Sequence, residues 1–242
     1  MDAAYDGCPL DVGLLRCGVG SETYTSAVSA APEESPPPRR RGRPPKALPQ
    51  GTDLRSSLID AAAAEIRESG WFATSTNRIA ARAGLSSGVF YNYFSDKADV
   101  LLAVYERWVM EEWAMVRRVF GEPGVGPRQR IDRLVPLLIE HHAAWSRLRH
   151  ALAVLARDDE RVRAARLQSR ITQIDEVVRL VGRRSSAKLR AAVAIRLMMF
   201  EAVADAIAAG DADAMALDRR TLSEELASSL MALLVSTNPS RG

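Results

Sequence analysis

Side chains suited to recognising a polyanion are concentrated in residues 74–97, whose sequence is TSTNRIAARAGLSSGVFYNYFSDK. Hydroxyl, amide and cationic groups of this kind hydrogen bond to phosphate oxygens and to the edges of bases. A short helix with small side chains at its tip can also enter the major groove of DNA, which is about 12 Å wide. The residues predicted to contact DNA in this stretch are Thr76, Arg78, Ser86, Ser87, Gly88, Val89, Tyr91, Asn92, Tyr93 and Lys97.

Two short helices must hold these side chains in place. Hydroxyl groups at residues 74–76 can cap a first helix that turns Ile79 inward. Gly84 follows where a three-residue turn needs a left-handed backbone, which glycine adopts without a steric penalty. A serine can then cap a second helix over about residues 86–92, with Phe90 facing the core. This layout predicts a helix-turn-helix.

The run T-x-x-I-A-x-x-A-G-L-S-S-G-V-F-Y-x-Y-F-x-x-K, from Thr76 to Lys97, resembles the DNA-binding signature of the TetR family of bacterial repressors. It covers 22 of the 242 residues. Phe90 replaces the commoner leucine or isoleucine, and Asn92 stands where a basic residue or histidine is frequent, which puts the contacts of residue 92 in question. The resemblance implies a homodimeric repressor that a small-molecule effector releases from a palindromic double-stranded operator. Activation instead of repression stays open.

Composition and periodicity predict an all-α fold. Hydrophobic residues make up 47% of the chain and charged residues 26%, and strand-like alternation of useful length is absent from the sequence. We expect a three-helix DNA-binding domain over residues 51–97 and a helical effector-binding and dimerisation domain over 98–242. The predicted helices after the turn region are 95–120, capped by Ser95, then 128–147, 148–156, 159–181, 186–209 and 218–236.

Residues 1–50 are proline-rich and are predicted to form a disordered tail. Within it, residues 39–46 form a basic arm, and Arg41-Gly42-Arg43-Pro44 resembles an AT-hook, in which two arginines lie along an A·T-rich minor groove. The alternative is an arm that binds phosphates without sequence preference, and both interpretations stay open. Residues 39–97 carry ten basic against five acidic side chains, which favours binding to a phosphate backbone.

The last two long helices are predicted to form a dimer interface. Residues 186–209 contain too many apolar positions for one narrow face, and leucines recur at helical spacing over 218–236. Two such helices from each subunit can build a four-helix bundle with two-fold symmetry. The alternative is that these side chains only complete the core of their own subunit.

The family resemblance also implies a small-molecule pocket between the middle helices. Large, adaptable or polar side chains on otherwise apolar helices are its candidate lining, although such side chains are commonly plain core. The candidates are Trp108, Glu112, Trp113, Met115, His141, His142, Trp145, Met198 and Met199. His141 and His142 point about 100° apart on a helix, so no metal site is predicted there, and no cofactor is predicted.

The sequence bears on two other functional classes. An enzyme would need a nucleophile with a base, a carboxylate pair or a metal set; no such pattern appears, and Cys8 and Cys17 lie outside the predicted fold. An architectural DNA-binding protein that acts without any effector is the remaining alternative. The sequence also lacks an apolar run long enough for a membrane span, which predicts a cytoplasmic protein with no membrane partner.

Overall fold

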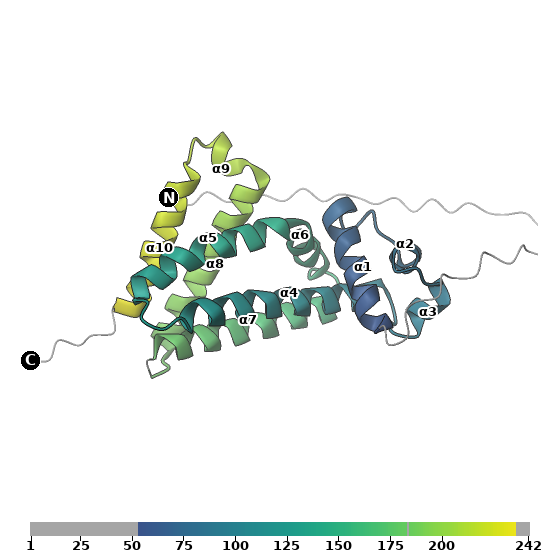
Figure 1. The fold of residues 1–242 in the computed structure, drawn as a ribbon, viewed down its shortest axis with the longest axis horizontal. Helices are drawn as coiled ribbons and strands as arrows, with labels where there is room; N and C mark the ends of the chain where they lie inside the picture. The colour runs from purple at the N-terminus through teal and green to yellow at the C-terminus, as the bar shows by residue number, and fades with distance from the viewer. Residues whose placement is uncertain (1–52, 183, 236–242) are drawn as a thin grey trace, which may run out of the picture. The chain divides into compact units, whose positions relative to one another are not determined.

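The computed structural model describes residues 53–182 and 184–235. Within these ranges the chain forms ten helices and no strand, which confirms the predicted all-α class (Figure 1). None of these helices is both long and apolar enough to cross a membrane. The predicted tail and the basic arm with Arg41 and Arg43 lie outside the described residues.

The helix-turn-helix forms largely as its local sequence predicts. Helix α1 (Leu54–Ser69) packs against α2 (Thr76–Arg82), and α2 packs against α3 (Ser87–Tyr91). The Ser75 side chain accepts a hydrogen bond from the backbone N–H of Arg78 and so caps α2. Gly84 adopts the left-handed backbone that the turn requires, with φ of 72°.

Helix α4 (Lys97–Phe120) continues through the boundary predicted between the two domains. Its cap is Asp96 and not Ser95, because the Asp96 carboxylate accepts a 2.8 Å hydrogen bond from the Asp99 N–H. Ser95 instead donates its own N–H to the Asp99 side chain at 3.0 Å. Carboxylate caps are favoured at a helix N-terminus because they accept from its free N–H groups and complement its dipole.

The remaining helices follow the predicted order with two differences. The predicted break after residue 147 falls earlier, at Trp145, and residues 210–213, predicted as a break, contribute to a short additional helix. Gly210 ends the preceding helix with φ of 81°, and two aspartates then complement the N-terminus of that short helix. The elements are α5 (Pro127–Ala144), α6 (Ser146–Leu155), α7 (Glu160–Val181), α8 (Ala187–Ala209), α9 (Asp211–Ala214) and α10 (Arg219–Val235).

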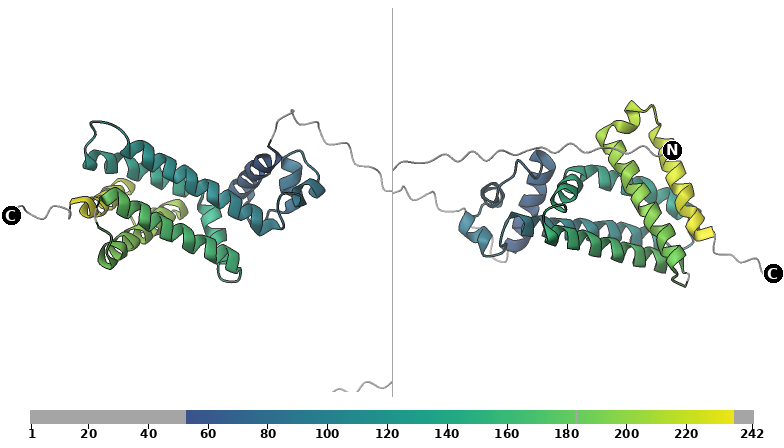
Figure 2. Two further views of the ribbon diagram at one scale, coloured as in Figure 1. Left: turned by 90° about the horizontal axis from the view of Figure 1, so that it is seen from below. Right: turned by 180° about the vertical axis from the view of Figure 1, so that it is seen from behind.

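The buried side chains form clusters, one of which extends across the domain boundary predicted between residues 97 and 98. One cluster joins α1 to α4 with α6 and the start of α7, and includes Phe90, Trp108 and Trp145. A second joins the later part of α4 to α5, α8 and α10. Helices α4 and α7 lie side by side, and α5 packs against both α8 and α10 (Figure 2). The helix-turn-helix therefore shares its core with the helices that follow it.

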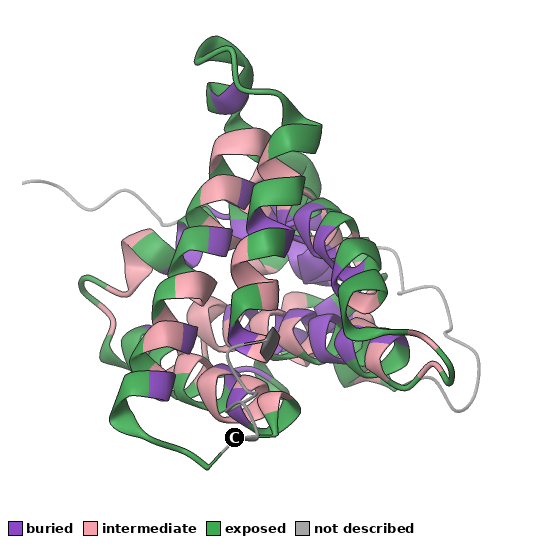
Figure 3. Cartoon of the chain, turned by 90° about the vertical axis from the view of Figure 1, so that its left-hand side faces the viewer, coloured by how far each residue is buried: buried purple, intermediate pink, exposed green. Residues whose placement is uncertain are grey.

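Helices α8 and α10 differ in how much apolar surface they expose. Leu226 and Leu233 of α10 are buried, so part of the predicted leucine stripe completes the core of its own subunit. By contrast, α8 leaves Ile195, Met198 and Met199 at 63%, 57% and 36% exposure. Figure 3 shows the chain from the end where α10 lies. The helices nearest the viewer are largely exposed or half-buried on their outer sides.

Candidate nucleic-acid interface and central cleft

The outer face of α3 carries small and polar side chains. Ser86, Gly88 and Asn92 are exposed, whereas Phe90 on the opposite face is fully buried. Tyr91 and Tyr93 follow at 55% and 40% exposure. The structure thus brings most of the sequence-predicted contact residues together on one accessible face, with a buried aromatic ring holding α3 from behind.

Hydrogen bonds between α2 and α3 fix the orientation of this face. The Thr76 and Tyr91 hydroxyl oxygens lie 3.2 Å apart, and the Ser87 hydroxyl donates to Asn77 Oδ1 at 2.7 Å. Asn77 was not predicted as a site residue, yet it is exposed beside Ser87 and extends the polar face. The sequence could not reveal this role of Asn77, because its partner Ser87 lies ten residues later on a separate helix.

Arg78 is held against α1 by a buried carboxylate that the sequence analysis missed. Its Nε donates to Glu65 Oε2 at 2.9 Å, and its Nη2 donates to the Ser69 hydroxyl at 3.2 Å. Arg82 lies 3.2 Å from the other Glu65 oxygen, and Glu65 itself is 6% exposed. Glu65 follows Leu58 by seven residues, a spacing that already places it on the inward face of α1. In this arrangement Arg78 docks α2 onto α1.

Lys97 also makes contacts within its own subunit. Its Nζ donates to the Trp71 backbone carbonyl at 2.6 Å and lies 4.0 Å from the centroid of the Trp71 ring. Partial burial lowers the pKa of Lys97 from its ordinary value. The ammonium group therefore anchors the start of α4 to the loop after α1, and the phosphate contact predicted for it stays a prediction.

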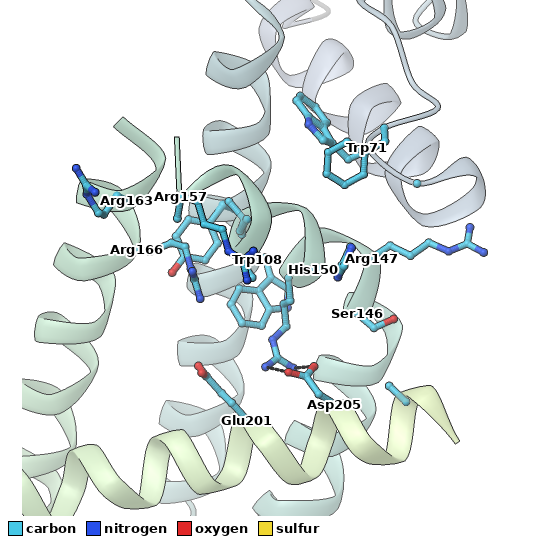
Figure 4. A pocket seen from close by; sticks show the side chains of 18 of the residues that line it. Trp71, Trp108, Ser146, Arg147, His150, Arg157, Arg163, Arg166, Glu201 and Asp205 are labelled. Carbon is cyan, nitrogen blue, oxygen red and sulfur yellow. Dashed lines mark hydrogen bonds and ion pairs between the residues drawn. The ribbon is translucent and has the colours of Figure 1, made fainter. Parts of the chain in front are cut away.

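A cleft of about 1150 Å³ lies among the α1–α2 loop, α4, α6, α7 and α8 (Figure 4). Two of the predicted ligand-binding residues line it, the buried Trp108 and the exposed Met198. Trp71, Tyr105 and His150 add aromatic surface, and several arginines of α6 and α7 also line the cleft. Sequence reasoning did not select these arginines, although Arg163, Arg166 and Arg170 recur at helical spacing on one face of α7.

A second, smaller hollow of about 100 Å³ lies nearer to α10 and is lined by Glu112, Trp113 and His142. Its volume is well below that of common ligand pockets, which hold about 300–1,000 Å³. The remaining predicted ligand-binding residues line neither of these two hollows. They are Met115, His141, Trp145 and Met199.

The two histidines of α5 pack around one indole ring. His141 stacks on Trp108 with ring centroids 5.4 Å apart, and His142 meets the same ring edge-on at 5.1 Å. His142 Nε2 and Glu112 Oε2 are hydrogen bonded at 3.0 Å. Burial lowers the pKa of His141, which favours its neutral form near pH 7. The described residues contain no group of three side chains able to hold a metal ion.

The geometry of α2, the turn and α3 agrees with a comparison with known proteins. Residues 58–104, which span most of α1 to the first part of α4, match the family described as bacterial regulatory proteins, tetR family. Residues 58–104 therefore carry a TetR-family DNA-binding domain. The relatives and structural neighbours that the chain matches are named as transcriptional regulators, which agrees with the expectation of a regulator and not of an enzyme.

Curated relatives of this chain are described as HTH-type transcriptional regulators. The HTH-type transcriptional regulator BetI of Burkholderia mallei is 30% identical over 128 residues, which are 48% of this chain. The match spans 65% of the length of that relative. The BetI regulator of Paraburkholderia phymatum is 29% identical over 152 residues, which cover 57% of this chain and 76% of the relative.

Solved structures of transcriptional regulators share the fold. A transcriptional regulator from Rhodococcus sp. Rha1 superimposes with a TM-score of 0.61 at 21% identity, covering 75% of this chain and 96% of the other. The fatty acid degradation regulator FadR from Bacillus halodurans gives a TM-score of 0.54 at 18% identity, covering 78% and 97%. These likenesses show that the shared fold extends beyond residues 58–104.

Proposed function

We propose that this chain is a homodimeric repressor that binds a near-palindromic operator and is released from it by a small-molecule effector. The exposed face of α3 carries the proposal, because it presents small and polar side chains on a rigid helix-turn-helix. Such a helix can enter a major groove while tyrosine hydroxyls meet phosphate oxygens. The proposal places the protein in the cytoplasm with its DNA.

The exposed side chains of α8 support the dimer. Ile195 and Met199 are exposed apolar side chains one helical turn apart on this long helix, and exposed apolar surfaces commonly mark protein interfaces. A two-fold axis near this surface would pair α8 with its copy and place two α3 helices on successive turns of one DNA face. We propose α8 as the main contact, with α10 contributing its outer side chains.

In this proposal, effector binding acts on the DNA-binding helices through two elements that also line the cleft, the α1–α2 loop and α4. The cleft is lined by Tyr105 and Trp108 of α4 and by Trp71 and Phe72 of the α1–α2 loop. Lys97, at the first turn of α4, is bonded to Trp71 of that same loop. Since the cleft and the helix-turn-helix share both elements, occupation of the cleft can change the position of α3.

Binding-site selection from random DNA with the full-length protein, at one stated salt concentration, tests this function. We expect an inverted repeat whose two halves are about one helical turn apart, because a symmetric dimer reads two half-sites. Enrichment of A·T-rich DNA without a repeat would support the architectural alternative. Absence of any enriched sequence would contradict both.

The dimer is tested by changing Ile195 to glutamate. Two-fold symmetry places two copies of each interface residue close together, so Ile195→Glu buries two like charges. We expect the dimer dissociation constant to rise at least about a hundredfold, as measured by sedimentation equilibrium. The control is Met110→Glu on α4, where an apolar side chain is similarly exposed at 60%. A dimer that resists Ile195→Glu would show that α8 is not the interface.

A further inference from the structure

The large central cleft carries an unusual excess of positive charge. Only two carboxylate side chains line it, Glu201 and Asp205 of α8. Six arginines line the same cleft, and they come from α6, the α6–α7 connection and α7 (Figure 4). They are Arg147, Arg149, Arg157, Arg163, Arg166 and Arg170.

Both carboxylates are already occupied by arginines. Arg149 Nη1 lies 2.8 Å from Asp205 Oδ1, and Arg170 Nη2 lies 2.5 Å from Glu201 Oε2. Within each of these two pairs, the carboxylate neutralises the charge of its arginine. The acidic residues of α8 are therefore not free to balance the remaining cations.

Three of the remaining arginines lack a carboxylate partner among the residues that the structure describes. Arg157 and Arg166 form no ion pair there, and Arg147 donates instead to the backbone carbonyls of Arg67 and Glu68. Figure 4 shows Arg157 and Arg166 on one side of Trp108 and Arg147 on the other. The guanidinium groups of Arg157 and Arg166 beside aromatic side chains suit a ligand with both an acidic group and a flat apolar part.

Two residues that line the cleft have buried N–H groups without a hydrogen-bond partner among the described residues. Trp108 is 3% exposed, and its indole N–H has no hydrogen-bond acceptor among the described residues. Arg170 Nη1 is also buried without an acceptor in the same part of the chain. Unsatisfied buried donors cost folding free energy, so each of these two N–H groups is a candidate to gain an acceptor when a ligand enters the cleft.

We propose that this cleft binds an organic anion that joins a carboxylate or phosphate group to an aromatic or other apolar body. The acidic group meets Arg157 and Arg166, and the apolar body packs against Trp108 and Tyr105. The proposal names the chemical class of the effector and so rests on the proposed function. Binding to the cleft is nevertheless measurable on the free protein without DNA, which separates the two.

The test compares two fluorescent probes that share one scaffold. 1-Anilinonaphthalene-8-sulfonate carries an anionic group, and N-phenyl-1-naphthylamine is the same scaffold without it. We expect the wild-type chain to bind the anionic probe more tightly than the neutral probe. The double substitution Arg157→Gln with Arg166→Gln should weaken binding of the anionic probe roughly tenfold and leave the neutral probe unchanged. Arg166→Lys alone should retain most of the affinity, because it keeps the charge.

Arg118→Gln is the matched control, since Arg118 is exposed on α4 and lines neither hollow. Circular dichroism and thermal unfolding of each variant verify that it is folded. Equal loss of both probes in the double variant would mean that the cleft wall had rearranged, and equal affinity for the anionic probe in wild type and double variant would mean that the arginines bind no anion. Either result overturns the proposal. So would weaker operator binding by the double variant with unchanged probe binding, because these arginines would then serve DNA phosphates.

Discussion

Replacing Gly88 with glutamate is expected to weaken operator binding at least about a hundredfold without unfolding the protein. Gly88 is exposed on α3, and a Cβ atom built there meets only the Ser86 hydroxyl oxygen, at 3.9 Å. The new side chain therefore fits the free protein. In the complex it places a carboxylate against the negatively charged DNA surface, where like-charge repulsion costs several kcal/mol. Fluorescence anisotropy with the selected operator, at constant salt, measures the loss.

The same substitution at Gly126 is the control. Gly126 is exposed before α5, has φ of −71°, and a Cβ atom there has no neighbour within 4 Å. Gly126→Glu should leave operator affinity and thermal stability near their wild-type values, since it adds the same charge away from α3. If Gly88→Glu bound the operator as tightly as Gly126→Glu, α3 would not be the element that enters the groove.

The helix-turn-helix was predictable because its determinants are local. Gly84 adopts a left-handed backbone, the Ser75 hydroxyl accepts from the N–H three residues ahead, and Phe90 lies on the inward face of a short amphipathic helix. Each of these features depends on residues within about one helical turn of one another. The amino-acid spacing therefore specifies both the elements and the face of α3 that stays exposed.

The partners of charged residues were not predictable in the same way. Lys97 bonds to Trp71, which precedes it by 26 residues, and Arg78 bonds to Glu65, 13 residues earlier. Spacing within one helix cannot reveal such contacts, because they depend on how separate elements pack. Two cations that look suited to phosphate in the sequence thus stabilise the joints between helices in the structure.

The lining of the central cleft also depends on how separate helices pack, so the sequence predicted only part of it. Candidate lining residues were selected for size and polarity, which identified Trp108 and Met198 but also Trp145, whose ring packs instead 5.1 Å from the Arg67 guanidinium. The arginines of α7 look like an ordinary solvated helix face when only the sequence is known. Their position in the same cleft as Trp108 depends on the packing of α6 and α7 beside α4, which no local pattern encodes.

Shortening Phe90 to alanine is expected to destabilise the whole described fold by about 3–4 kcal/mol. Phe90 is fully buried and lies 5.6 Å from the Phe94 ring, ring centroid to ring centroid. Its cluster also contains Trp108 of α4 and Leu148 of α6, so the cavity forms in a core that the helix-turn-helix shares with later helices. For a fold of this size, the loss corresponds to a melting temperature lower by roughly 10 °C. Thermal unfolding followed by circular dichroism measures it.

Phe72→Ala removes the same atoms from a side chain that is 59% exposed, and it should cost less than about 1 kcal/mol. The unfolding curve of Phe90→Ala also tests whether the helix-turn-helix and the later helices unfold together. Because the Phe90 cluster extends from α1 through α4 to α6, Phe90→Ala should still unfold in one cooperative transition. A separate early transition confined to the helix-turn-helix would contradict the shared core, and with it the coupling that we propose between the cleft and α3.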